Sequence, residues 1–227
     1  MQDDLLVPGH PASILLPGTN VDLACMQIVL ESLLRPHNAL PYLVVAVADA
    51  SSVLVDVGAQ GRALVALGAP RSVLTVLLYT SERAANATAH FGAVFAWVDN
   101  GHCLVALYET MRGSSVFKDA ADRVAAELQT VSGGVLEVMH HVIDAKRQSM
   151  GSNACRVRTV LAVDTLLSKG ALLLDVPWVD LPGRLDAEWG VDGFAAAYDA
   201  AQDDGRAPFC QLLQGVYAAA HAAPVGL

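Results

Sequence analysis

Charged residues are scarce in this sequence of 227 residues. Asp, Glu, Lys and Arg make up 16% of it, against about 25% in typical soluble domains. The charge that is present is mostly acidic, with 23 acidic and 14 basic residues and a net charge of −9. Because neutralising phosphates requires a basic surface, we expect no nucleic-acid partner. Hydrophobic residues make up 54% of the chain, which excludes intrinsic disorder.

Other absences narrow the class of protein further. No uninterrupted apolar run of about 18 residues occurs in the sequence, so we predict no membrane span. The first residues are acidic where a secretory signal would be basic, which favours a cytoplasmic location. Cysteines are few and never form a CxxC pair, so we predict no disulfide framework, no metal and no cofactor. The four cysteines are Cys25, Cys103, Cys155 and Cys210.

The hydrophobic pattern divides the chain into three parts. Residues 1–20 contain three prolines and are predicted to form an irregular arm, residues 21–150 an α+β domain, and residues 151–227 an extension packed on it. The predicted fold is α+β, with an antiparallel sheet flanked by helices. The expected elements of the domain's first half are a helix at 22–35, strands at 42–47, 53–57, 63–67 and 73–79, and a short helix that starts at Thr80.

A β-hairpin is the clearest local prediction. Two apolar runs, 91–98 and 103–108, flank the sequence Asp-Asn-Gly-His. Asn-Gly favours a two-residue type I′ turn, since both central residues then need positive φ. We therefore expect Asp99 to face His102 across the turn.

A long helix is predicted after Ser114, over residues 116–143. Its apolar residues repeat at spacings of four and three, which is a heptad stripe. A chain with so little charge favours self-association through an apolar face, so we predict a homodimer. The alternative is that the stripe packs against the chain's own sheet. The predicted interface comprises Val124, Leu128, Val131, Val135 and Val138.

The pattern is weaker beyond residue 151. Weak alternation predicts strands at 156–163 and 172–176, followed by a loop over 177–193 and helices at 194–201 and 208–220. Residues 174–204 contain eight acidic residues and one basic residue, which is typical of a solvated face.

One constellation suggests catalysis. Cys25 lies near the start of the first predicted helix, where the helix dipole lowers the pKa of a thiol. His102 and Asp99 follow much later, and a cysteine on a helix before a histidine on a strand resembles papain-like hydrolases. The alternative is that Cys25 is a buried core residue and that His102 is a solvated turn residue.

The order of elements over residues 22–147 resembles type III secretion chaperones and YbjN-like proteins. The likeness rests on the segment 80–86, the hairpin at 91–108 and the long helix that opens at Ser114. The resemblance implies a non-catalytic, dimeric adaptor that holds an extended segment of a polypeptide client. The client would bind the exposed part of the strands, unless these side chains form the core: Tyr42, Val44, Phe95, Trp97 and Leu104.

The sequence therefore predicts a binding protein, most directly a chaperone-like adaptor. Two alternatives stay open. One is a cysteine hydrolase that uses Cys25 and His102, and the other is a structural protein that assembles through its apolar faces.

Overall fold

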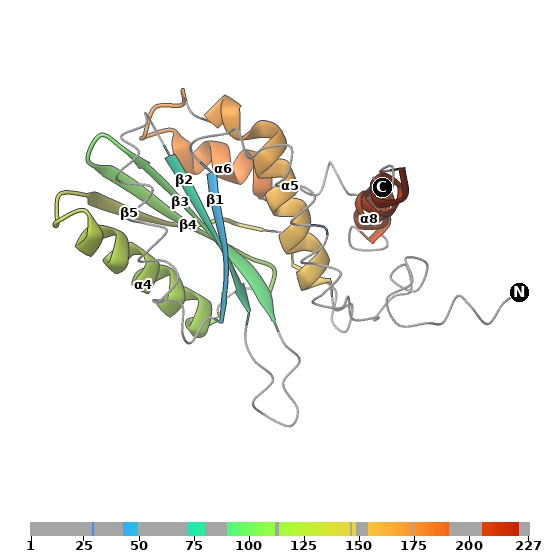
Figure 1. The fold of residues 1–227 in the computed structure, drawn as a ribbon. Coiled ribbons are helices and arrows are strands. Elements are labelled where there is room, and N and C mark those ends of the chain that lie inside the picture. Colours follow the sequence, from blue (N-terminus) through green and yellow to red (C-terminus); the bar gives the residue numbers. More distant parts are fainter. Residues whose placement is uncertain are drawn as a thin grey trace, which may run out of the picture.

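The structure is a computed structural model, and it describes residues 29, 43–49, 72–79, 90–111, 114–145, 147–148, 154–173, 175–190 and 206–222. These residues form a five-stranded sheet with the strand order β1-β2-β3-β4-β5, together with four helices (Figure 1). The strands are β1 (Leu43–Asp49), β2 (Ser72–Tyr79), β3 (Phe91–Asp99), β4 (His102–Glu109) and β5 (Glu137–Val142). The helices are α4 (Ser115–Val131), α5 (Cys155–Leu173), α6 (Leu181–Trp189) and α8 (Arg206–Ala222).

The α+β class is confirmed, but the sheet is mixed rather than antiparallel. The three central strands pair antiparallel, whereas β1 runs parallel to β2 and β5 runs parallel to β4. Parallel neighbours need a crossover connection of a dozen or more residues. Helix α4 is that crossover between β4 and β5, which makes this part of the chain a βαβ unit.

The predicted hairpin is confirmed in its turn and its register. Asn100 and Gly101 have φ of 46° and 87°, the left-handed conformations that a type I′ turn requires. Asp99 pairs with His102, as expected. The sequence therefore predicts β3 and β4, two of the three central strands, before any tertiary contact is considered.

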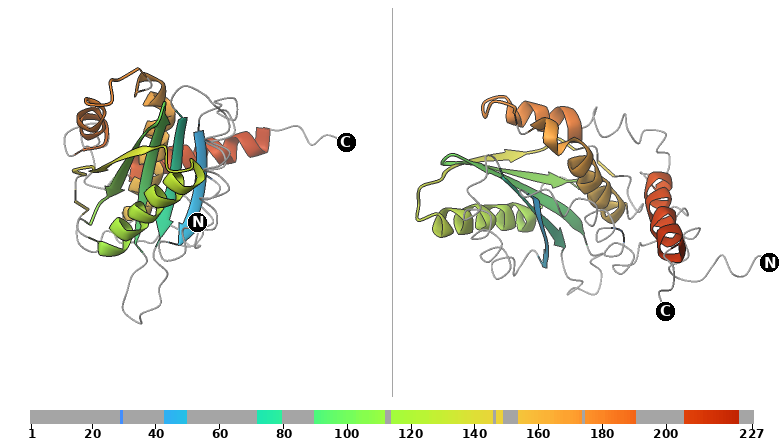
Figure 2. Two further views of the ribbon diagram at one scale, coloured as in Figure 1. Left: turned by 90° about the vertical axis from the view of Figure 1, so that its left-hand side faces the viewer. Right: turned by 45° about the horizontal axis from the view of Figure 1, so that its top comes forward.

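Helices cover both faces of the sheet (Figures 1 and 2). Alternate residues of β3 point to opposite sides, as strand geometry dictates. Phe95 and Trp97 pack with α5, α6 and α8, while Val94 and Ala96 pack with α4. Trp189 of α6 lies against Phe95, and its indole N–H donates to the Ala162 carbonyl at 2.9 Å.

The predicted helix over 116–143 is wrong beyond residue 131. Ser114 caps the helix as predicted, because its hydroxyl accepts the Phe117 N–H. The helix ends at Val131, since Gly133 and Gly134 adopt φ of 71° and 79°, which glycine adopts without steric cost. The chain then turns into strand β5. The heptad spacing of apolar residues continues past Gly134, although residues 137–142 form a strand and not a helix.

We expect Gly134→Ala to lower the free energy of unfolding by about 1–2 kcal/mol, because an L-residue is strained at this φ. Gly183→Ala is the matched control. Gly183 is an exposed helix residue with open space at its Cβ position, so alanine should stabilise the protein by up to about 1 kcal/mol. Urea denaturation followed by circular dichroism measures both. Equal effects of the two substitutions would contradict the assigned turn.

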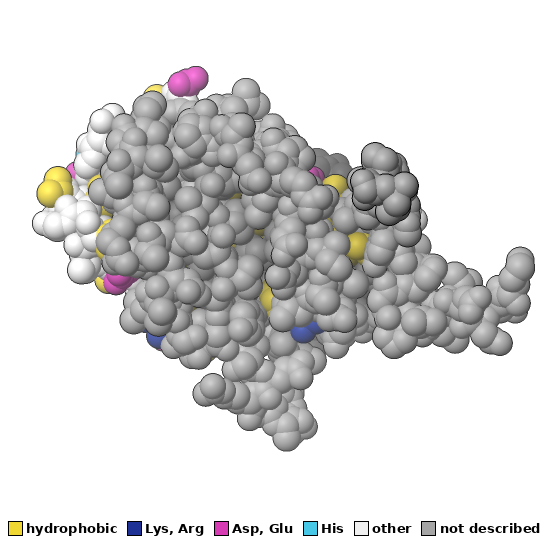
Figure 3. Space-filling model, in the orientation of Figure 1, with side chains coloured by type: hydrophobic (Ala, Val, Ile, Leu, Met, Phe, Trp, Pro, Cys, Tyr) yellow, Lys and Arg dark blue, Asp and Glu magenta, His cyan; other side chains and the backbone are white. Residues whose placement is uncertain are grey.

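The residues predicted for the dimer interface lie in different environments. Val124 and Leu128 are fully buried against the chain's own sheet, so they do not form an exposed face. Val138 lies in β5 and packs partly against the same cluster. Val135 is 74% exposed at the end of the molecule where α4 leads into β5, and hydrophobic side chains reach the surface there (Figure 3). The homodimer itself stays a prediction.

The residues predicted to bind a client are mostly core residues. Phe95, Trp97 and Leu104 are fully buried in the cluster between the sheet and α5, so they are not available to a partner. Val44 lies in β1, and Tyr42 lies outside the described residues.

Helix α5 replaces the two strands that were predicted at 156–163 and 172–176. Its first turns are buried almost all round, because the sheet covers one side and α6 and α8 cover others. A helix buried on every side has no polar face and hence no helical period in its sequence. The loop predicted at 177–193 likewise contains α6, whereas α8 confirms the helix predicted at 208–220.

Several predictions fall outside the described residues. These are the arm at 1–20, most of the helix at 22–35, the strands at 53–57 and 63–67, the short helix after Thr80 and the helix at 194–201. None of the described helices has the length and apolarity needed to cross a membrane.

Candidate active site

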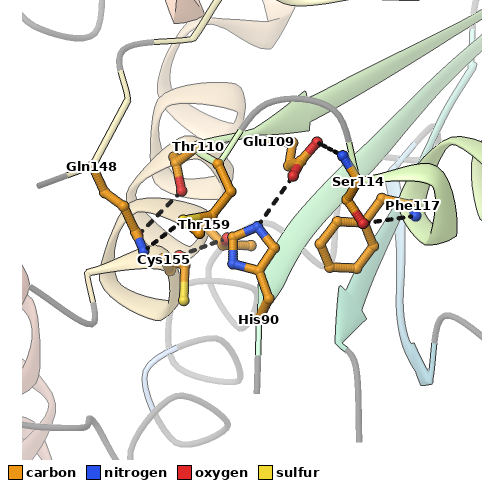
Figure 4. A network of polar contacts seen from close by, with 9 residues as sticks. His90, Glu109, Thr110, Ser114, Phe117, Gln148, Cys155 and Thr159 are labelled. Atoms are coloured by element: carbon orange, nitrogen blue, oxygen red, sulfur yellow. Dashed lines mark hydrogen bonds and ion pairs between the residues drawn. The ribbon is translucent and has the colours of Figure 1, made fainter. Parts of the chain in front are cut away.

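Three polar side chains from separate elements meet at one end of the sheet (Figure 4). His90 immediately precedes β3, Glu109 is the last residue of β4, and Cys155 is the first residue of α5. All three lie at the ends of strands or helices. Functional side chains are common at such positions, because the rigid elements hold them in place.

The strand register explains why His90 and Glu109 are close. Gly92 pairs with Glu109 across the β3–β4 ladder, and His90 is two residues before Gly92. Residues two apart in a strand share a face, so the imidazole and the carboxylate lie on the same side of the sheet. Helix α5 then packs against β3 and β4 and brings its first residue to this end.

His90 and Glu109 form an ion pair. His90 Nε2 lies 3.4 Å from Glu109 Oε1, and the Glu109 side chain is only 4% exposed. The other carboxylate oxygen of Glu109 accepts the backbone N–H of Ser114 at 3.4 Å. One carboxylate oxygen therefore faces the imidazole and the other accepts a backbone N–H.

Cys155 contacts the same imidazole, which lies between the thiol and Glu109 (Figure 4). Burial acts to raise the pKa of Cys155, but a hydrogen bond and charge from His90 and backbone N–H groups of Phe91 and Arg156 lower it overall. The position at the start of a helix acts in the same direction, because the dipole favours an anion there.

The pKa of His90 changes in the complementary direction. Burial acts to lower it, but hydrogen bonds and charges from Cys155 and Glu109 raise it to about 9. These opposite shifts of the two pKa values favour a thiolate beside an imidazolium. This is the protonation state in which a cysteine is nucleophilic and its histidine holds a transferable proton.

The other described cysteines lack this environment. Burial raises the pKa of Cys103 to about 12, and Cys210 is buried in α8 against the core. Cys103 therefore stays a thiol, and within the described chain Cys155 is the cysteine with a lowered pKa.

Gln148 is tied to the end of β4, directly beyond Glu109. Its backbone N–H donates to the Thr110 carbonyl at 3.1 Å, and its side-chain amide accepts the Thr110 hydroxyl at 3.3 Å. The same amide donates to the sulfur of Met111. These contacts fix the segment that leads from β5 towards α5.

The arrangement has the parts of a nucleophilic triad. Such an arrangement can supply a nucleophile in Cys155, a general acid and base in His90, and a carboxylate in Glu109 that orients the imidazole. In the described ranges no group of three or more His, Cys, Asp or Glu side chains is placed to hold a metal ion.

The residues predicted for a hydrolase lie elsewhere. His102 is at the other end of β4 from Glu109, roughly 23 Å away at about 3.3 Å per residue, and its ring contacts Glu137 and Trp178. Asp99 lies beside it in the hairpin turn. Cys25 lies outside the described residues. The structure thus brings a Cys–His–carboxylate set together, but from other positions.

Sequence reasoning missed His90, Glu109 and Cys155 as a set. One signal was available, because His90 and Glu109 directly flank the two apolar runs of the predicted hairpin. A hairpin brings the outer ends of its strands together, so this His/Glu pair followed from the register. Cys155 was missed because the sequence after it predicts a strand, so a position at the start of a helix was not expected.

Comparison with known proteins gives no sequence match and several structural ones. No family model matches the chain, and no curated protein matches it. A structure of an AvrA deletion variant with IP6 and CoA has 15% identity and a TM-score of 0.48, covering 90% of this chain and 73% of its own.

Two other solved structures are similar at the same level. A de-sumoylating protease has 9% identity and a TM-score of 0.48, covering 92% of this chain and 87% of its own. The *Legionella pneumophila* effector RavZ has 10% identity and a TM-score of 0.45, covering 79% of this chain and 53% of its own.

The resemblance to secretion chaperones and YbjN-like proteins is wrong, and so is the adaptor function that it implied. One of the similar structures is named as an effector and another as a de-sumoylating protease, and none of the three is named as a secretion chaperone. The chain itself departs from that resemblance as well. Residues 137–142 form a fifth strand, where the resemblance needed one long final helix.

Proposed function

We propose that this protein is a cysteine hydrolase that cleaves the bond between an acyl carbon and its leaving group. In this proposal Cys155 is the nucleophile, His90 is the general acid and base, and Glu109 orients His90. The observation that carries the proposal is the imidazole of His90 held between the Cys155 thiol and the Glu109 carboxylate. A purely structural role would not need a buried ion pair whose desolvation is costly.

The first chemical step is acylation. The Cys155 thiolate attacks the carbonyl carbon of an amide, and the carbonyl oxygen becomes an oxyanion beside the N–H groups at the start of α5. The imidazolium of His90 then donates its proton to the departing amine. The C–N bond breaks, and the acyl group is held on Cys155 as a thioester.

The second step is deacylation. Neutral His90 removes a proton from water, and the resulting hydroxide attacks the thioester carbonyl. The C–S bond breaks, a carboxylic acid is released, and the Cys155 thiolate and the His90 imidazolium are restored. Glu109 keeps the imidazole in the orientation that both proton transfers require.

The proposed chemistry favours a reducing compartment such as the cytoplasm. An accessible thiolate is readily oxidised, so a catalytic cysteine stays active where thiols are kept reduced. The described cysteines form no disulfide with one another, which supports this location.

The proposal is tested with a simple activated ester, p-nitrophenyl acetate, as acyl donor. We expect a burst of nitrophenol and an acetyl group on the peptide that contains Cys155, found by rapid acid quench and mass spectrometry. Subsequent loss of the acetyl group to water identifies a hydrolase. Acetylation that maps to another residue, or none at all, would contradict the proposal.

A further inference from the structure

The first turn of α4 contacts two members of the candidate triad. Ser114, which caps the helix, contacts Glu109, and Phe117, one turn later, contacts His90. Figure 4 shows both residues beside the polar network.

Ser114 holds the carboxylate through its backbone. Its N–H donates to Glu109 Oε2 at 3.4 Å, which leaves Oε1 facing His90. An N–H at a helix start carries part of the positive end of the dipole, so it attracts the carboxylate oxygen that it faces. The contact therefore fixes which oxygen meets the imidazole.

Phe117 holds the imidazole from one side. Its ring is fully buried, with its centroid 5.1 Å from that of His90 and an interplanar angle of 43°. The Ser114 hydroxyl accepts the Phe117 backbone N–H at 3.4 Å. A Cβ atom at Gly92 would be in ordinary contact with the Phe117 ring at 3.5 Å but would clash with the Tyr108 carbonyl oxygen at 2.9 Å, so the close approach of β4 is what requires glycine there.

We propose that Ser114 and Phe117 are positioning residues, which hold Glu109 and His90 so that the imidazole faces Cys155. This inference rests on the proposed function and extends it to two residues outside the triad. Neither residue takes part in bond making. Their effect is on the fraction of molecules in which the imidazolium and the thiolate are paired.

Two substitutions of Ser114 separate the effect of its backbone N–H from the effect of its hydroxyl. Ser114→Ala removes the capping hydroxyl and keeps the N–H, whereas Ser114→Pro removes both. Proline fits the backbone, because Ser114 has φ of −67°, close to the value that the ring imposes. The difference between the two variants therefore reports the N–H that Glu109 accepts.

The readout is the rate at which iodoacetamide alkylates Cys155 at pH 6, followed by peptide mapping. Without the N–H, Glu109 holds the imidazolium less well, and the thiolate loses part of its counter-charge. We expect Ser114→Pro to react at least about threefold more slowly than Ser114→Ala, because a smaller fraction of its molecules holds the thiolate and the imidazolium paired. Equal rates in the two variants would overturn the role of Ser114.

Phe117 is tested in the same assay by Phe117→Leu, with Val124→Ala as the matched control. Both are fully buried residues on the same face of α4, but Val124 lies two turns further from the triad. We expect only Phe117→Leu to slow alkylation, by about threefold or more at pH 6, even where both variants lower the melting temperature equally. Equal alkylation rates in the two variants would overturn the role of Phe117.

The unsubstituted protein separates failure of this inference from failure of the proposed function. If its Cys155 reacts at pH 6 no faster than an ordinary thiol, the proposed function fails and the inference fails with it. If Cys155 reacts fast in the unsubstituted protein and equally fast in all four variants, only the positioning inference fails.

Discussion

Replacing Cys155 with alanine is expected to lower ester turnover by about four orders of magnitude or more. Removing one member of a nucleophilic triad leaves only the contribution of binding and of the oxyanion donors. The Cys155 side chain is small and lies in the core, and alanine keeps its Cβ atom there, so the fold should persist. Turnover of p-nitrophenyl acetate measures the effect, with circular dichroism as the check on folding.

Two other cysteine variants complete this test. Cys25→Ala examines the cysteine that the sequence first suggested as nucleophile, and Cys103→Ala examines a buried thiol whose pKa of about 12 keeps it neutral. Both should retain turnover. If Cys25→Ala lost turnover while Cys155→Ala stayed active, the nucleophile would be Cys25 and not Cys155.

Replacing His90 with glutamine is expected to have the second largest effect. The variant loses the general acid and base, which is worth about 10²–10⁴ in turnover. It also loses the counter-charge of the thiolate, so the pKa of Cys155 should return towards the ordinary thiol value of about 8.5. Alkylation of Cys155 at pH 6 should therefore fall by about 100-fold.

His102→Gln is the matched control for His90→Gln. Both histidines lie beside a strand of the same hairpin, and both face a carboxylate at 3.4 Å. His102 is about half exposed and lies at the other end of the hairpin from Cys155, so its replacement should change neither rate. An equal loss in both variants would mean that the effect of His90→Gln comes from a weakened hairpin rather than from the site.

The part of this site that the sequence predicts is the part that depends on local structure. The Asn-Gly turn fixes the register of β3 and β4, and the register alone places Glu109 opposite Gly92, close to His90. Ser114 is also recognisable as a cap, because serine before an apolar helical stripe is a common start signal.

The remaining part depends on contacts between distant segments. Cys155 meets His90 only because α5 packs across β3, and α5 has no polar face that would reveal it as a helix. The strand β5 was hidden for a different reason, since its apolar residues continued the heptad spacing of α4 across Gly133 and Gly134. The spacing of hydrophobic residues indicates which side chains are buried. Here it did not indicate that α4 ends before β5 begins.

The central claim is that Cys155 and His90 form a thiolate–imidazolium pair, and the pH dependence of Cys155 alkylation tests it most directly. The lowered pKa of Cys155 and the pKa of His90 near 9 together predict the shape of the profile. The rate should be high already in mildly acidic solution, stay nearly constant while His90 is protonated, and change again as the pH rises through about 9. A rate that is negligible below pH 7 and rises about tenfold per pH unit up to the ordinary thiol pKa would contradict the account.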